Sequence, residues 1–94
     1  MQKVMYNPAH PGEILREYLG ATPVGVAAKH LRVARSTLSR LLNRHASFTA
    51  AMALRLSDAF GTEPGMWLDL QQQYDLWQAA RRKRPKIPRF PRAA

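Results

Sequence analysis

The sequence predicts an all-α fold, in which five short helices form one domain and a basic tail follows. Apolar side chains recur at the spacing of a helix face, as at Met52, Leu56 and Phe60. Prolines stand where helices are expected to begin, and glycines stand where they are expected to end. Residues 81–94 are dominated by arginine and proline, which excludes a continued helix there. The domain is therefore expected to cover residues 1–80 and the tail residues 81–94.

The first helix is expected to begin at His10-Pro11, because proline is favoured in the first turn of a helix. Gly20 is expected to end it. Its apolar stripe consists of Ile14, Leu15, Tyr18 and Leu19. The preceding residues 1–9 show no periodicity, and we expect an extended lead-in whose Val4, Met5 and Tyr6 pack on the domain.

The stretch VGVAAKHLRVARSTLSRLLN, residues 24–43, organises the chain. It predicts two short helices joined by a tight turn at residues 32–34, with Thr22 capping the first of them and Pro23 as its first residue. Ala28 is small enough to sit where two helices cross steeply, as they do in a helix-turn-helix. A core of Val33, Leu38 and Leu41 closes the same crossing.

The second helix of this pair leaves a polar face without acidic side chains. The residues expected to face outward are Arg35, Ser36, Ser39, Arg40 and Asn43, and Arg44 follows them. Such a face suits the major groove of DNA, where arginine and hydroxyl side chains read base edges. The alternative is that these residues are the solvated side of an ordinary helical hairpin.

Two positions depart from the usual pattern of this motif. Arg32 stands where the turn often needs a positive φ, which glycine adopts most easily. Ala34 stands at the expected cap of the second helix and has no side-chain acceptor. Each departure is expected to cost about 1 kcal/mol.

A fourth helix is expected from the cap Thr49 to Phe60, with Gly61 ending it, and a fifth helix is expected after a cap at Thr62. The fifth helix carries a heavy aromatic load. Its expected dimer or partner interface consists of Trp67, Leu70, Tyr74 and Trp77. For Trp67, simple filling of the core is the competing interpretation.

The positive charge is unevenly distributed. The formal net charge is +9, and residues 81–94 supply +7 of it without an acid, so residues 1–80 carry +2. Within the domain, residues 34–47 carry +3 and residues 48–80 carry −3. The positive end contains the proposed recognition helix, which favours binding of a polyanion there.

The tail repeats proline at Pro85, Pro88 and Pro91, which favours an extended, polyproline-like conformation. We expect it to be disordered alone. Two roles are open for this tail: it aids solubility, or it is an arm that contacts DNA phosphates and adds affinity.

Several classes of chemistry find no support. The chain has no cysteine, no apolar run of membrane-spanning length and no signal-peptide core, which predicts a cytoplasmic protein. Its histidines fit no metal-ligand spacing. Asp58, Glu63, Asp69 and Asp75 are expected to be solvated helix faces. No catalytic residue, metal or cofactor is therefore predicted, although an acidic side could meet a basic protein partner.

Three segments together resemble the HigA (VapI-like) antitoxins, which are Xre/Cro-type helix-turn-helix proteins. They are HPGEILREYL, VAAKHLRVARSTLSRLLN and MALRLSDAFGTEPGMWLDLQQQYDLW. The resemblance covers roughly Pro8 to Ala79. It implies a compact, lambda-repressor-like domain of five helices that forms a homodimer and presents two recognition helices to adjacent major grooves.

The same resemblance implies two partners. The protein would neutralise a HigB-like toxin, a ribonuclease of the RelE-like class, and would bind operator DNA in its own promoter to repress transcription. By position, Arg35, Ser36, Ser39 and Arg40 would face the groove, with Asn43 and Arg44 nearer the DNA backbone. A stand-alone Xre-type repressor without a toxin is the main alternative, and an RNA-binding or enzymatic protein is a more distant one.

Overall fold

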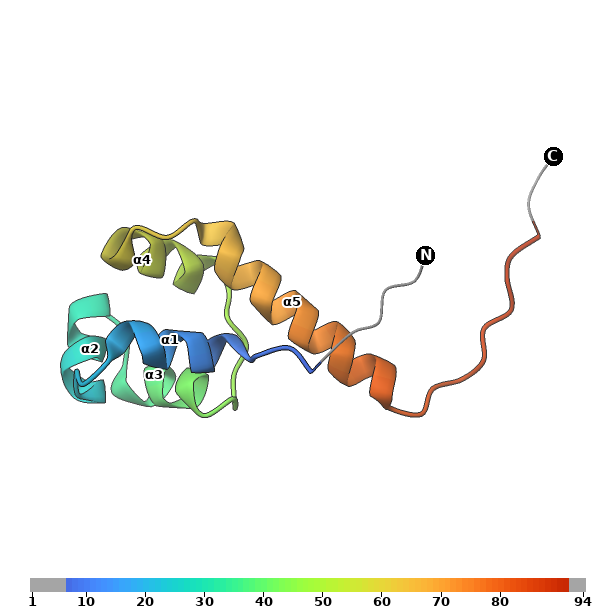
Figure 1. The fold of residues 1–94 in the computed structure, drawn as a ribbon, viewed down its shortest axis with the longest axis horizontal. Helices are drawn as coiled ribbons and strands as arrows, with labels where there is room; N and C mark the ends of the chain where they lie inside the picture. The colour runs from blue at the N-terminus through green and yellow to red at the C-terminus, as the bar shows by residue number, and fades with distance from the viewer. Residues whose placement is uncertain (1–6, 92–94) are drawn as a thin grey trace.

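The computed structural model describes residues 7–91, and within that range its regular elements are five α-helices and no strand. Its elements are α1 (Pro11–Leu19), α2 (Val24–Leu31), α3 (Arg35–Leu42), α4 (Ala50–Phe60) and α5 (Pro64–Arg81). Figure 1 shows α1, α2 and α3 grouped at one end with α4 beside them, while α5 runs diagonally away. The predicted five-helix, all-α fold is confirmed. The predicted packing of Val4, Met5 and Tyr6 lies outside the described residues.

One apolar core joins the first four helices to the start of α5. Its buried members are Leu15, Ala27, Ala28, Leu31, Leu38, Leu41, Leu42, Phe48, Met52, Ala53, Leu56 and Trp67. Ala28 is buried together with Leu38 and Leu41, as expected for a small residue at a helix crossing. The helix α3 is thus fixed by its apolar side and leaves its polar side in solvent.

Trp67 belongs to this core. Its side chain is 0% exposed, and its ring stacks on Phe48 with centroids 5.8 Å apart. Its indole Nε1 donates a hydrogen bond of 2.8 Å to the Thr62 hydroxyl, so the polar tip is satisfied inside the domain. The expectation that Trp67 forms a partner interface is therefore wrong, because the monomer already buries the whole side chain.

Most helix ends follow the sequence signals. His10 caps α1 and Gly20 ends it, while Thr49 caps α4 through a 3.2 Å bond from the Met52 N–H and Gly61 ends it. The N-cap residues of α2 and α5 differ from those predicted from the sequence. Extended Pro23 is the N-cap of α2, so that helix begins one residue later than expected. Glu63 and not Thr62 is the N-cap residue of α5, and the Thr62 hydroxyl accepts the Trp67 indole N–H instead.

The turn between α2 and α3 forms with Arg32 in the left-handed region at φ 61°. The Val33 N–H donates to the Ala28 carbonyl at 3.0 Å, and the Arg55 guanidinium donates to the Leu31 carbonyl at 3.0 Å. These bonds satisfy carbonyls that a helix end leaves without partners. Ala34 at the start of α3 makes no side-chain cap bond, as the sequence predicted.

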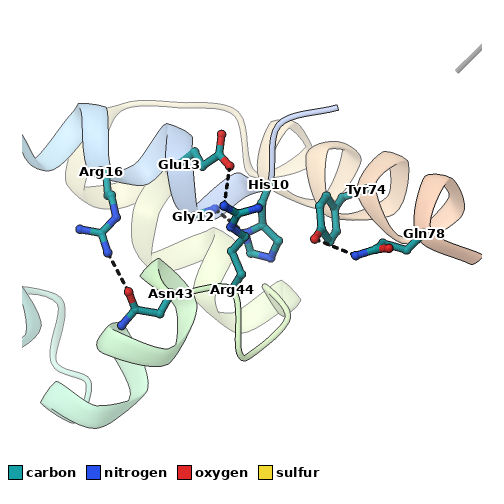
Figure 2. Close-up of polar contacts among 8 residues, drawn as sticks. All are labelled: His10, Gly12, Glu13, Arg16, Asn43, Arg44, Tyr74 and Gln78. Atoms are coloured by element: carbon teal, nitrogen blue, oxygen red, sulfur yellow. Dashed lines mark hydrogen bonds and ion pairs between the residues drawn. The ribbon is translucent and has the colours of Figure 1, made fainter. Parts of the chain in front are cut away.

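The start of α1 sits directly on the end of α3. His10 Nδ1 accepts a hydrogen bond of 2.9 Å from the Gly12 N–H, which Figure 2 shows. A Cβ placed on Gly12 would collide with the Leu41 carbonyl oxygen. The backbone of α1 can therefore approach the backbone of α3 only because residue 12 has no side chain.

This close approach is testable with two matched glycines. Gly12 and Gly65 each follow the proline that begins a helix, but a Cβ on Gly65 meets nothing within 4 Å. Gly12→Ala is expected to lower the free energy of unfolding by roughly 1–3 kcal/mol, because α1 must move off α3. Gly65→Ala is expected to leave it unchanged or raise it by up to about 1 kcal/mol. Equal urea midpoints for the two variants would contradict the proposed contact.

Candidate nucleic-acid interface

The predicted recognition face is assembled on α3 and at its C-terminal end. Arg35, Ser36 and Arg40 are exposed, and Ser39 is half-buried beside them. Asn43 and Arg44 follow directly and are also exposed. The structure therefore brings all six predicted residues onto one helix and its end, and it adds exposed Thr37.

The end of α3 is tied to α1 by a polar chain. Asn43 Nδ2 donates to Ser39 Oγ at 3.3 Å, and Arg16 Nη2 donates to Asn43 Oδ1 at 2.9 Å. Figure 2 shows Arg16 reaching from α1 to Asn43. Sequence reasoning missed Arg16, because nothing in its own helix indicates a partner 27 positions away. Its cation adds to the positive charge at this end of the domain.

The arginines of the site, Arg35, Arg40 and Arg44, differ in their surroundings. Arg40 Nη2 donates to the His45 carbonyl at 2.9 Å, which ties it to the loop after α3. Arg44 has φ 64° and pairs with Glu13 at 3.5 Å, and both side chains are about half exposed. An exposed pair contributes only about 0–1 kcal/mol, so Arg44 can exchange Glu13 for a phosphate at little loss. Arg35 begins the helix, the place from which recognition helices contact bases.

His10 lies beneath this end of the interface. The pKa of its imidazole is lowered from 6.5, first by burial and then by the positive charge of Arg44; Glu13 and Asp75 oppose the shift. The neutral ring suits the structure, because its Nδ1 must accept from the Gly12 N–H. Its edge meets the ring of Tyr74, with centroids 4.7 Å apart, so His10 joins α1 to α5 as well.

A second surface lies along α5. Leu70, Tyr74 and Trp77 are half-buried there, and the Arg81 guanidinium lies 4.4 Å from the centroid of the Trp77 ring. Leu76 on another side of the helix is 56% exposed. It borders a groove of about 400 Å³ lined by Phe48, Leu68, Gln71, Gln72, Asp75, Leu76 and Ala79. Apolar surface thus remains available on α5 after Trp67 is buried.

Four of the six acidic residues belong to the second half of the chain, whereas Glu13 on α1 pairs with Arg44 at the end of α3. Asp58, Glu63, Asp69 and Asp75 are exposed and come from α4, α5 and the connection between them. Asp75 accepts a hydrogen bond of 2.9 Å from Gln71, whose carbonyl oxygen in turn accepts from the Phe48 N–H at 2.9 Å. Within residues 7–91, no three histidine or acidic side chains gather as a metal site, and no helix could cross a membrane.

Comparison with known proteins finds similar chains of this size, although no family model matches. The chain is 37% identical over 87 residues to antitoxin HigA-1 of Vibrio cholerae, covering 87% of this chain and 80% of that protein. It is 42% identical over 79 residues to virulence-associated protein I of Dichelobacter nodosus, with coverages of 79% and 71%. It is 40% identical over 77 residues to the helix-turn-helix transcriptional regulator YddM of Escherichia coli, with coverages of 80% and 82%.

Solved structures give the same result. An addiction module antidote protein of the HigA family from Coxiella burnetii superposes with a TM-score of 0.76 at 44% identity, covering 79% of this chain and 84% of that one. Pseudomonas aeruginosa antitoxin HigA, solved with its higBA promoter, gives 0.73 at 36% identity, with coverages of 77% and 82%. These proteins are antitoxins and regulators, so the prediction of a binding protein rather than an enzyme is confirmed.

The neutral His10 predicts a specific pH dependence. Because folding lowers its pKa, the unfolded chain binds the proton more readily, and stability falls as the pH drops below about 6.5. His10→Asn keeps an uncharged cap acceptor and cannot titrate. The unfolding free energy of the parent is expected to fall below pH 6.5 more steeply than that of the variant, as followed by urea denaturation. Parallel curves from pH 8 to pH 5 would contradict the buried neutral cap.

Proposed function

This chain belongs to the HigA family of helix-turn-helix antitoxins, and on that premise we propose that it binds operator DNA in its own promoter and represses transcription. The observation that carries the proposal is the acid-free exposed face of α3, which is positioned by α1 and α2. Relatives of this fold include one solved with its promoter. The face matches what a recognition helix needs in order to enter a negatively charged groove.

The residues divide into two roles at DNA. Arg35 and Arg40 are proposed to contact base edges, where a bidentate arginine–guanine pair discriminates by roughly 1–3 kcal/mol. Ser36 and Ser39 lie between them on the helix. Asn43 and Arg44 are proposed to contact phosphates, which fix position without reading sequence. Arg16 joins this second group through its hydrogen bond to Asn43.

The proposed DNA-binding unit is a homodimer. Its two copies of α3 would enter adjacent major grooves, at half-sites about one helical turn apart. We place the contact on α5, with Leu70, Tyr74 and Trp77. These side chains are half-buried in one chain, and aromatic residues are enriched where proteins meet. Trp67 takes no part, since the core already encloses it.

The second proposed partner is a HigB-like toxin, a ribonuclease of the RelE-like class. RNA-cleaving proteins carry positive charge for their substrate, and four acidic residues of this chain are exposed on α4, on α5 and in the connection between them. A basic toxin therefore has a complementary surface on α4 and α5 while α3 remains available to DNA. The cytoplasm, where toxin, messenger RNA and operator coexist, is the expected location.

A stand-alone repressor is the second candidate. It shares every feature of α2 and α3, and the relative YddM is a helix-turn-helix transcriptional regulator. The two candidates differ in one observable, which is whether a second protein accompanies the chain in its host.

The DNA-binding proposal is tested by selecting preferred sites from a randomised duplex pool and comparing two arginine variants. Arg35→Ala is expected to lose roughly 1–3 kcal/mol of preference for the selected half-site over one with a replaced base pair. Arg44→Ala is expected to weaken binding to both duplexes equally. It is also expected to reduce by about one the slope of the logarithm of affinity against the logarithm of salt concentration. Both would be measured by fluorescence anisotropy over a range of salt concentrations.

Two results would contradict this division. If Arg35→Ala kept the base preference of the parent, the Arg35 side chain would not be contacting a base. A changed consensus in Arg44→Ala would mean that this residue reads sequence. Circular dichroism of each variant controls for loss of fold.

A further inference from the structure

The tail that follows α5 is built unlike the domain. Residues 82–91 are all exposed, and residues 83–91 form neither helix nor strand. Figure 1 shows this segment leaving the far end of α5 and running clear of the helices. Its cations are Arg82, Lys83, Arg84, Lys86 and Arg89, and no acidic residue accompanies them. The start is fixed, because Arg81 packs on the Trp77 ring in the last turn of the helix.

Two large apolar side chains stand among these cations. Ile87 is 79% exposed and Phe90 is 90% exposed. A segment that only improves solubility or touches phosphates gains nothing from exposed apolar side chains, because water disfavours them. Their presence indicates a binding surface with both charged and apolar walls.

The minor groove of A·T-rich DNA has those walls. When narrow, it concentrates negative potential that attracts inserted arginine, and minor-groove proteins also use isoleucine, phenylalanine and proline against base steps. Proline at every third position keeps the segment slender and extended. At about 3.1 Å per residue, residues 82–91 reach about 31 Å, close to one turn of duplex. The minor groove of A-form RNA is wide and shallow and offers no such slot.

We propose that residues 82–91 form a minor-groove arm that binds A·T-rich DNA beside the base pairs contacted by α3. The inference rests on the proposed DNA-binding function and adds a second, independent source of base preference. Arginine is central to it, because the guanidinium is more weakly hydrated than an ammonium group and leaves water more easily.

The test uses the full chain and three duplexes of equal length without a half-site: alternating A·T, alternating I·C and alternating G·C. An inosine·cytosine pair lacks the minor-groove amino group of guanine, so it resembles A·T in the minor groove and G·C in the major groove. The parent is expected to bind A·T and I·C duplexes about tenfold more tightly than G·C, the size of one good base contact. The charge-matched variant R82K/R84K/R89K is expected to bind all three within about twofold while keeping the salt slope of the parent.

Three results would overturn the arm. If the parent bound all three duplexes equally, the tail would contact only phosphates and would not read the minor groove. I·C behaving like G·C would place the preference in the major groove. Tighter binding to a duplex RNA of matched length, lost when the tail is removed, would make it an RNA-binding segment.

Failure of the arm is separable from failure of the proposed function. The same proteins are measured on a duplex with the selected half-site and G·C flanks, where only α3 contributes base preference. A retained half-site preference with no flank preference refutes the arm alone. A flank preference without any half-site preference refutes sequence reading by α3 and leaves the arm standing.

Discussion

The proposed DNA-binding end, formed by α3 and the start of α1, depends on one backbone contact, the approach of Gly12 to the Leu41 carbonyl. Because no Cβ separates them, α1 lies directly on the end of α3. This close packing of α1 on α3 lets Glu13 pair with Arg44 and lets Arg16 donate a hydrogen bond to Asn43. His10 completes the joint by accepting the Gly12 N–H and packing on Tyr74. One turn of α1 therefore sets the position of the recognition helix and connects it to α5.

The recognition helix needs this support because it is weak by itself. It has eight residues and no side-chain cap, far below the length at which an isolated helix is stable in water. Its rigidity comes from the buried Leu38, Leu41 and Leu42. Such an arrangement fixes the backbone through its apolar side and leaves polar side chains free to exchange internal partners for DNA. Positive charge on α3 and acidic charge on α4 and α5 then suit the domain to two different partners.

Local signals predicted most of the fold, since proline, glycine and threonine act within a few residues of their position. His10, Gly20, Thr49 and Gly61 mark helix ends as expected. The failures involve tertiary competition. Thr62 lies one residue before the N-cap of α5 and its hydroxyl accepts the Trp67 indole N–H, while Trp67 is enclosed by the core and stacks on Phe48.

The exposed polar side of α3 was predictable because this helix has a clear period, with Leu38, Leu41 and Leu42 inside and arginines outside. Arg16 and the role of Gly12 were not, because each depends on how closely two distant helices approach. Which side of α5 forms the proposed contact with a second chain likewise depends on packing that one sequence does not encode locally.

We propose that one small domain serves both DNA and a toxin. The most direct measurement is affinity purification of the tagged chain from its native host, followed by intact mass spectrometry and sequencing of bound DNA. We expect a small basic protein in near-stoichiometric amount, together with promoter DNA from the chain's own operon. Recovery of the chain with promoter DNA but without a second protein would contradict the antitoxin assignment and leave a free-standing repressor.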